Sequence, residues 1–179
     1  YMNFKKVLLI FIFSLCICLD LFAAKEKTSF LRGDGSTATA YISTPDNTEF
    51  FPLVVYIDGS FMQSVENNFS VLAYVFNQKH IGVAALEKRG ITAESININE
   101  FEAYDTYENR LNDYIQLICE LNMNLTHWNG QIIFIGSSEG GKIAPKLTLY
   151  FAPQTMGTVL IGSGGGIPFG EEIKYQIKN

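Results

Sequence analysis

Apolar residues along the chain fall into short continuous runs separated by stretches with helical spacing. Three such runs lie within 52–58, 81–86 and 131–135, and each is followed by glycine or a charged residue. A continuous apolar run of this length is typical of a strand buried on both faces. We expect a further strand at 158–161, and a hairpin of two short strands within 28–44.

Two of the stretches between these runs have the spacing of helices. Apolar side chains recur every three to four residues over 69–76, and we expect the polar cluster Glu66-Asn67-Asn68 to cap that helix. Another helix follows the run at 131–135, beginning at Lys142 and ending near Phe151. Residues 91–101 show no clear period, so we expect a loop over the sheet there.

A long helix is expected to begin at a cap formed by Asp105 or Thr106. Asp105 with Glu108 three residues later resembles a capping box. Cys119 lies among the apolar residues of this helix and is expected to be an inert core thiol. The apolar stripe at i, i+4, i+7, i+8 and i+11 consists of Tyr107, Leu111, Tyr114, Ile115, Ile118 and Leu121.

Strands and helices therefore alternate along the chain. This alternation predicts an α/β fold, with a mostly parallel sheet covered by helices on both faces and preceded by a β-hairpin. Ligands of such sheets bind beyond the carboxyl ends of the strands. We expect the functional site at that edge, among the loops 58–62, 87–90, 137–141 and 162–166.

The segment around Ser138 carries the clearest candidate chemistry. It fits the G-x-S-x-G pattern of a nucleophile elbow, and it lies between a predicted strand and a predicted helix, as an elbow must. A serine at such a sharp turn needs small neighbours, and Gly136, Gly140 and Gly141 supply the room. The turn would lift the Ser138 hydroxyl off the sheet, where the first N–H groups of the helix favour an oxyanion.

With these motifs, the chain resembles the N-terminal part of an α/β-hydrolase. The resemblance covers roughly residues 28–168. Three segments carry it in the family's order: VVYIDGS at 54–60, GVAALEKRG at 82–90 and FIGSSEGGKIA at 134–144. It implies a fold whose C-terminal strands are missing from this chain.

The resemblance also implies roles for individual residues. Ser138 matches the nucleophile. The oxyanion-hole N–H groups would come from Ser60, with Phe61 as the alternative, and from Glu139, the residue after the nucleophile.

The two site-edge loops differ in how well they match. Many relatives have His-Gly where this chain has Asp58-Gly59. A carboxylate beside an oxyanion is unfavourable unless it points away or is paired, and Lys88 or Arg89 could pair with it. The family's arginine at the position of Arg89 organises loops over the site. A solvated loop cation is the alternative for Arg89.

The chain departs from the family in lacking a base. The family's order is serine, then acid, then histidine, yet no histidine follows Ser138. His80 and His127 precede predicted strands, which places them near the opposite edge of the sheet. Glu171 and Glu172 come too early in the fold for the triad acid.

Two explanations for the missing base remain open. The chain is either incomplete and inactive alone, or a non-catalytic relative that binds without turnover. We favour the first, because a last strand with a bare hydrophobic edge is a liability that folded proteins normally cover.

The predicted function is a serine hydrolase acting on an ester, thioester or peptide acyl group of a small molecule or peptide. An acyltransferase and a hydrolase-like binding module are the alternatives. A phosphate loop at 162–166 is disfavoured because Pro168 and Gly170 interrupt the helix it needs. No cluster has metal-ligand spacing, so no metal or other cofactor is expected.

Composition and the first residues set the class of protein. The chain is 47% hydrophobic with a formal net charge of −5, which fits a globular domain without the basic surface that nucleic acids need. Residues 1–24 have the layout of a signal peptide, with Lys5 and Lys6 before the uncharged segment 7–19. Cleavage after residue 23 or 24 would leave 25–179 as the N-terminal part of the hydrolase domain.

These features predict an exported bacterial protein, periplasmic or secreted. Thirteen helical residues reach only about 20 Å, short of a hydrocarbon core of about 30 Å. A membrane anchor formed by residues 7–19 is the alternative, and only then would the protein contact a membrane.

Overall fold

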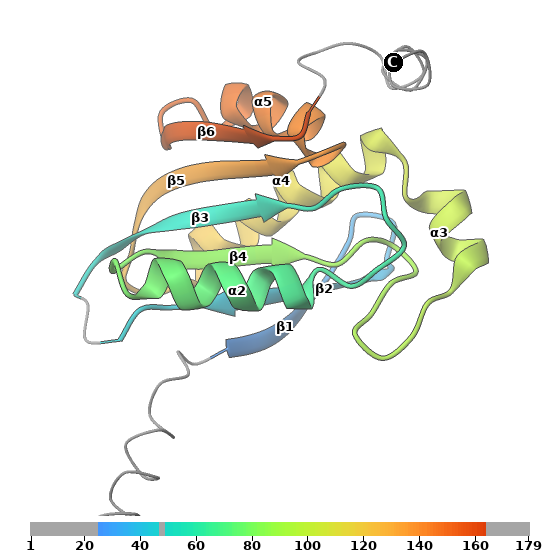
Figure 1. The fold of residues 1–179 in the computed structure, drawn as a ribbon, viewed down its shortest axis with the longest axis horizontal. Coiled ribbons are helices and arrows are strands. Elements are labelled where there is room, and N and C mark those ends of the chain that lie inside the picture. Colours follow the sequence, from blue (N-terminus) through green and yellow to red (C-terminus); the bar gives the residue numbers. More distant parts are fainter. Residues whose placement is uncertain (1–24, 47–48, 164–179) are drawn as a thin grey trace, which may run out of the picture.

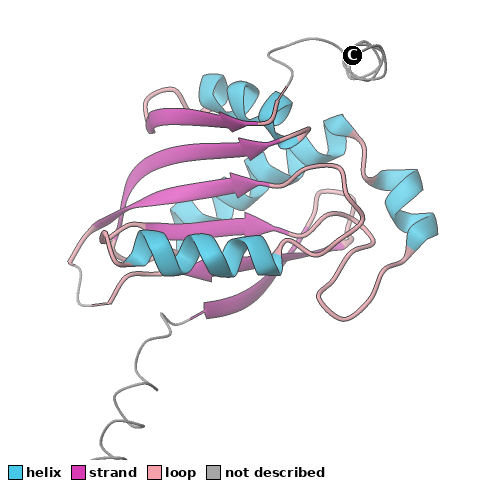
Figure 2. Ribbon diagram, in the orientation of Figure 1, coloured by secondary structure: helices cyan, strands magenta, loops and turns pink. Residues whose placement is uncertain are grey.

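The computed structural model describes residues 25–46 and 49–163, which build a six-stranded sheet between two layers of helices (Figures 1 and 2). The expectations for residues 1–24 and for the segment beyond Ser163 lie outside the described residues. The strands are β1 (Lys25–Leu31), β2 (Thr37–Ser43), β3 (Phe51–Ile57), β4 (Gly82–Leu86), β5 (Trp128–Ser137) and β6 (Thr155–Ile161).

The sheet is mostly parallel, as predicted. Its order is β1-β2-β4-β3-β5-β6, and the four strands from β4 to β6 run parallel to one another. Val54 of β3 lies between Val83 of β4 and Ile133 of β5 in register. The predicted hairpin is also confirmed, because β1 and β2 pair antiparallel and β2 joins them to β4.

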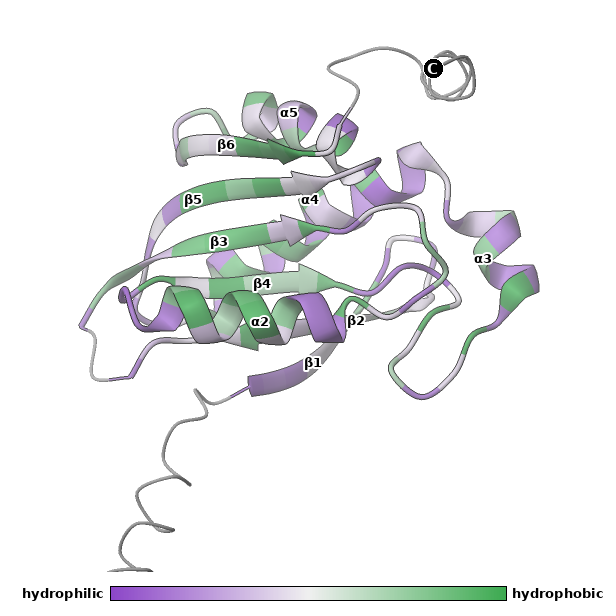
Figure 3. Cartoon of the chain, in the orientation of Figure 1, coloured by the Kyte–Doolittle hydropathy of each residue, from purple (hydrophilic) through white to green (hydrophobic). Residues whose placement is uncertain are grey.

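Helices cover both faces, which explains why the central strands are apolar without alternation (Figure 3). Helix α2 (Glu66–Asn77) packs its Phe69 and Ala73 with Val54 and Tyr56 on one face. Helices α4 (Tyr107–Asn124) and α5 (Gly140–Tyr150) pack on the other face against the alternate side chains of β3: Leu53, Val55 and Ile57. None of the helices in the described ranges is long and apolar enough to span a membrane.

The helix starts differ from those expected. The cluster Glu66-Asn67-Asn68 is the first turn of α2 itself. Ser64 accepts from the N–H of Glu66 at 3.1 Å, and the buried Glu87 carboxylate accepts from the N–H of Val65 at 3.0 Å. Thr106, not Asp105, caps α4, accepting from the N–H of Asn109 at 3.2 Å. The capping box of Asp105 and Glu108 is therefore wrong.

Two further expectations are wrong because the side chains concerned do not lie on the buried face of a helix. The presumed loop 91–101 ends in a helix, α3 (Ile98–Tyr104), capped by Asn97. This helix is two turns long and buries none of its side chains, so it leaves no apolar period. Cys119 is exposed on the outer side of α4, although Leu117 and Ile118 beside it are buried.

The last described strand has an uncovered apolar surface. Within the described ranges β6 pairs with β5 alone. Its side chains Met156, Val159, Leu160 and Ile161 are each about half exposed. The bare hydrophobic edge expected from the sequence is present in this part of the chain.

Candidate active site

The loops that follow the parallel strands meet at one edge of the sheet. Segments 58–62, 87–90 and 138–139 leave the carboxyl ends of β3, β4 and β5, to which the strand arrows point in Figure 1. Gly162 and Ser163 begin the corresponding segment after β6. Every residue named below as part of the candidate site lies on this edge or directly behind it.

Ser138 occupies the turn between β5 and α5. The strand ends at Ser137 and the helix begins at Gly140, so the predicted strand–turn–helix geometry is present. Ser138 has a φ of 51°, in the left-handed region that a non-glycine residue seldom adopts, and it is exposed. A left-handed serine at the strand end is the conformation that raises a side chain clear of the sheet.

The glycines around Ser138 stand where no side chain fits. A Cβ on Gly136 would lie 2.7 Å from the backbone of Gly140 and Gly141. A Cβ on Gly140 would lie 2.6 Å from the carbonyl oxygen of Asp58. The helix start is thus pressed against the end of β5 and the end of β3, which requires glycine at both positions.

The loop after β3 lies against Ser138. A Cβ built on Gly59 would be 3.1 Å from the Cβ of Ser138. Ser60 is half-buried beside it, and Phe61 is 77% exposed. Within residues 25–46 and 49–163, the backbone N–H groups of Ser60, Phe61 and Glu139 donate to no acceptor. The N–H groups expected as oxyanion donors are therefore unpaired in these ranges, and the loop that carries Ser60 and Phe61 approaches Ser138 at Gly59.

Asp58 is buried and paired. The ammonium of Lys88 donates to its Oδ2 at 2.7 Å, and the hydroxyl of Tyr56 donates to Oδ1 at 3.0 Å. Burial, together with the nearby Asp58 carboxylate, raises the pKa of Tyr56 to about 12. Of the two cations proposed as partners of Asp58, Lys88 takes that role.

Arg89 is held elsewhere. Its Nε and Nη2 donate to the two carboxylate oxygens of Asp113 on α4 at 2.9 and 2.8 Å, and its Nη1 donates to Asp34 in the β1–β2 turn. The side chain is buried, so the alternative of a solvated loop cation is wrong. These two carboxylates raise the pKa of Arg89 above its ordinary value. Arg89 thus ties three segments together behind the site edge.

Arg110 is a site residue that the sequence reasoning missed. It is buried on α4, and it donates from Nη1 to Oε2 of Glu139 at 2.8 Å and from Nη2 to the carbonyl oxygen of Asp58 at 2.6 Å. Its Nε lies 3.9 Å from Asp105, whose pKa is raised by burial against the opposing charge of Arg110. One signal was available: Arg110 is four residues before the buried Tyr114, on the apolar face of the helix.

The two histidines lie at the other edge of the sheet, as expected. His80 lies two residues before β4 and His127 directly precedes β5, at the amino ends of these strands. No histidine therefore accompanies Ser138 in the described ranges. Those ranges also hold no group of three His, Cys, Asp or Glu side chains that could bind a metal ion.

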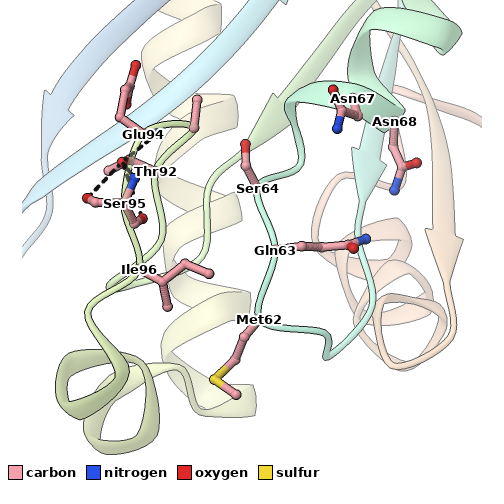
Figure 4. A pocket seen from close by; sticks show the side chains of 10 residues that line it. Met62, Gln63, Ser64, Asn67, Asn68, Thr92, Glu94, Ser95 and Ile96 are labelled. Atoms are coloured by element: carbon pink, nitrogen blue, oxygen red, sulfur yellow. Dashed lines mark hydrogen bonds between the residues drawn. The ribbon is translucent and has the colours of Figure 1, made fainter.

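A polar groove of about 710 Å³ opens on the site edge, between the β3–α2 loop and the segment 92–96 (Figure 4). Met62, Gln63 and Ser64 form one wall, directly after the Ser60–Phe61 pair. Asn67 and Asn68 at the start of α2 and Thr92, Glu94, Ser95 and Ile96 complete it.

Comparison with known proteins finds this fold among hydrolases. No family model and no curated protein matches the sequence. Among solved structures, a protein assigned as a dipeptidyl aminopeptidase IV from Bacteroides ovatus matches 79% of this chain with a TM-score of 0.65 and 19% identity. Esterase Est22 matches 82% of it with a TM-score of 0.64 and 21% identity.

An alpha/beta hydrolase from Novosphingobium aromaticivorans matches 77% of this chain with a TM-score of 0.60 and 20% identity. The chain spans only part of these proteins: 21% of the aminopeptidase, 47% of Est22 and 44% of the Novosphingobium hydrolase. At such low identities the matches show the fold, which is part of an α/β-hydrolase fold with an N-terminal antiparallel hairpin.

Proposed function

We propose, from the premise that this chain forms part of an α/β-hydrolase fold, that it carries the nucleophile and oxyanion hole of a serine hydrolase. The observation that supports the proposal most directly is the backbone of Ser138. An exposed serine held at a φ of 51° between a strand and a helix stores strain of the kind found at functional sites.

In the proposed reaction, the Oγ of Ser138 attacks the carbonyl carbon of an ester, thioester or peptide acyl group. The negative charge that develops on the carbonyl oxygen is stabilised by the N–H groups of Glu139 and of Ser60 or Phe61. The loop of Ser60 and Phe61 approaches Ser138 at Gly59, and within the described residues these N–H groups have no other acceptor to give up.

The proton of Ser138 needs a base. Both histidines of the sequence lie at the opposite edge of the sheet from Ser138. We therefore propose that the base and its acid partner come from a part of the protein outside this sequence. Activity tests therefore call for the full-length protein that contains this chain.

The exposed position of Phe61 and the polar groove beside it suit a substrate with a small acyl or peptide group at Ser138 and further polar atoms in the groove. We also propose that residues 1–24 are a signal peptide and that the enzyme is therefore exported from the cytoplasm.

Fluorophosphonate labelling of the full-length protein tests the nucleophile. We expect covalent labelling that maps to Ser138 by peptide mass spectrometry and that is lost in Ser138→Ala. Ser137→Ala, one residue earlier, is the matched control and should label normally. Labelling that persists in Ser138→Ala would exclude Ser138 as the nucleophile, and a full-length protein that neither labels nor hydrolyses aryl esters would favour the binding-module alternative.

A further inference from the structure

We infer that Arg110 is a positioning residue that fixes the distance between the two walls of the oxyanion hole, which are the loop 58–61 and the turn 138–140. The inference rests on the proposed function, since it assigns Arg110 a part in the reaction of Ser138. It deepens that proposal by naming what holds the donors in place, and it comes from a side chain for which no role was expected from the sequence.

One planar group contacts both walls. The Nη1 of Arg110 donates to the carboxylate of Glu139 at 2.8 Å, and Glu139 supplies the N–H that follows the nucleophile. The Nη2 donates at 2.6 Å to the carbonyl oxygen of Asp58, which begins the loop that contains Gly59 and Ser60. Because a guanidinium is rigid, these two bonds set the distance between the loop and the turn.

Arg110 bridges the loop and the turn at a place where a change in the distance between them would displace the oxyanion donors. Gly59, directly after Asp58, approaches Ser138, directly before Glu139, so closely that a Cβ on it would be 3.1 Å from the serine Cβ. Donors of an oxyanion hole act only within a narrow range of distance from the developing charge. Arg110 itself is 3% exposed and anchored on α4, which is part of the main core.

The close ion pair of Arg110 is with Glu139, at 2.8 Å, and not with Asp105. The Nε of Arg110 and the Oδ1 of Asp105 face each other at 3.9 Å, and neither atom has a hydrogen-bond partner within the described ranges. The cation therefore directs its two short hydrogen bonds at the site walls and not at Asp105.

The chain offers a matched control in Arg32. This arginine is also buried, and it too bridges a carboxylate and a main-chain carbonyl: its Nε donates to Asp113 at 2.9 Å and its Nη1 donates to the carbonyl oxygen of Thr37 at 2.6 Å. It lies in the β1–β2 turn and contacts neither wall of the site. Substitution of either arginine by lysine keeps the charge and removes the planar fork.

The experiment compares Arg110→Lys and Arg32→Lys with the parent full-length protein. Steady-state hydrolysis of p-nitrophenyl acetate gives kcat and KM, and inhibition by phenylboronic acid, which forms a tetrahedral adduct with a serine, reports on the oxyanion hole. Hydrogen exchange of peptides covering residues 58–61 and 138–140 reports on the walls without requiring turnover.

For Arg110→Lys we expect kcat to fall by roughly 10- to 100-fold at unchanged KM, with a parallel loss of boronate affinity. Exchange should rise in both peptides. Arg32→Lys should leave kcat, boronate affinity and the exchange of both peptides unchanged.

The outcomes separate the two proposals. Parental kcat and parental exchange in Arg110→Lys would overturn the role of Arg110 while leaving the hydrolase intact, and so would an equal loss of kcat in Arg32→Lys. A parent protein that lacks turnover and boronate binding would overturn the hydrolase. The exchange data would then still decide whether Arg110 holds the two walls together.

Discussion

Gly59 and Ser138 are in near contact, although 79 positions separate them in the sequence: a Cβ built on Gly59 would lie 3.1 Å from the Cβ of Ser138 and 3.7 Å from its Oγ. The contact joins the end of β3 to the end of β5, which are neighbouring parallel strands. It places the loop after β3 beside the serine that follows β5. A larger side chain at position 59 would therefore disturb the arrangement of the loop and Ser138.

Gly59→Ala should therefore impair the site more than the fold. The added methyl group would push the loop from Ser138 by a few tenths of an ångström, costing about 1–3 kcal/mol of stability at most. Displaced donors should lower kcat/KM for p-nitrophenyl acetate by roughly tenfold or more. Gly33→Ala is the control, because a Cβ there meets nothing within 4 Å. Full activity in Gly59→Ala would contradict the close packing of loop and serine.

Ser138→Gly should be more stable than Ser138→Ala. A left-handed backbone costs a residue with a Cβ about 1–2 kcal/mol, and glycine pays no such cost. Urea unfolding of both variants measures the difference, which we expect to be about 1 kcal/mol in favour of glycine. The same pair of substitutions at Ser137, in the extended strand, should give the opposite order. Equal stabilities at position 138 would argue against strain at the turn.

The sequence predicted the elbow because its requirements are local. A buried strand, a helix and glycines two residues on either side of a serine can all be recognised within one short segment, from Gln131 to Leu147. The alternation of strand and helix predicted the parallel sheet in the same way, since each element buries one continuous or periodic apolar surface. These predictions did not depend on knowing which distant residues meet.

Apart from the cap of α4, which is the local side chain of Thr106, the expectations that were wrong and the residue that was missed involve distant partners or the lack of a buried face. The carboxylate of Glu87, which directly follows β4, accepts from the N–H of Val65 at the start of α2, and no local pattern could reveal this contact. Arg110 bridges segments that lie 52 and 29 residues away. The short helix α3 buries no side chain, so no apolar period marked it. Local chemistry thus gave the serine, while the side chains that hold its surroundings required the fold.

The buried pair of Lys88 and Asp58 should respond strongly to the loss of one partner. Both side chains are almost fully buried, and Lys88→Met would leave the Asp58 carboxylate with only the neutral donors Tyr56 and Asn68. We expect a loss of about 3–5 kcal/mol in urea unfolding, and recovery of most of it in Lys88→Met combined with Asp58→Asn.

An exposed ion pair provides the comparison for Lys88. Lys27 and Glu94 lie 3.0 Å apart but remain in solvent, so Lys27→Met should cost no more than about 1 kcal/mol. Similar losses for Lys88→Met and Lys27→Met would mean that the Asp58 carboxylate is solvated, and the pairing described above would be wrong.

Asp34 should contribute to stability in a defined pH range. Hydrogen bonds from Arg89 and Ser36 lower the pKa of this carboxyl well below its usual value of 3.8. A lowered pKa in the folded state means that the stabilisation is fully present above pH 3.8 and is lost as the pH falls below it. Asp34→Asn should thus be less stable than the parent protein at pH 6, and the difference should disappear under strongly acidic conditions.

Thermal unfolding of both proteins from pH 6 down to the acid limit measures this difference. The side chain is about half exposed, so added salt should also reduce it. A difference that stays constant through the acid range would assign the effect of the substitution to packing and not to the charge of Asp34.

The polar groove beside Phe61 should affect substrate binding without affecting the chemical step. Asn67 is exposed on the groove wall, and its amide can bind polar substrate atoms remote from the acyl carbon. Asn67→Leu removes that amide at nearly constant volume. For an aryl ester of a blocked dipeptide we expect KM to rise severalfold while kcat is unchanged, since such binding is equal in the ground and transition states. p-Nitrophenyl acetate is too small to reach the groove, and its kinetics should not change.

Asn112→Leu, at an exposed position on α4, controls for the loss of a surface amide. An unchanged KM for the dipeptide ester in Asn67→Leu would place the substrate elsewhere on the site edge, because a groove that binds the substrate must register the loss of a donor and an acceptor from its wall.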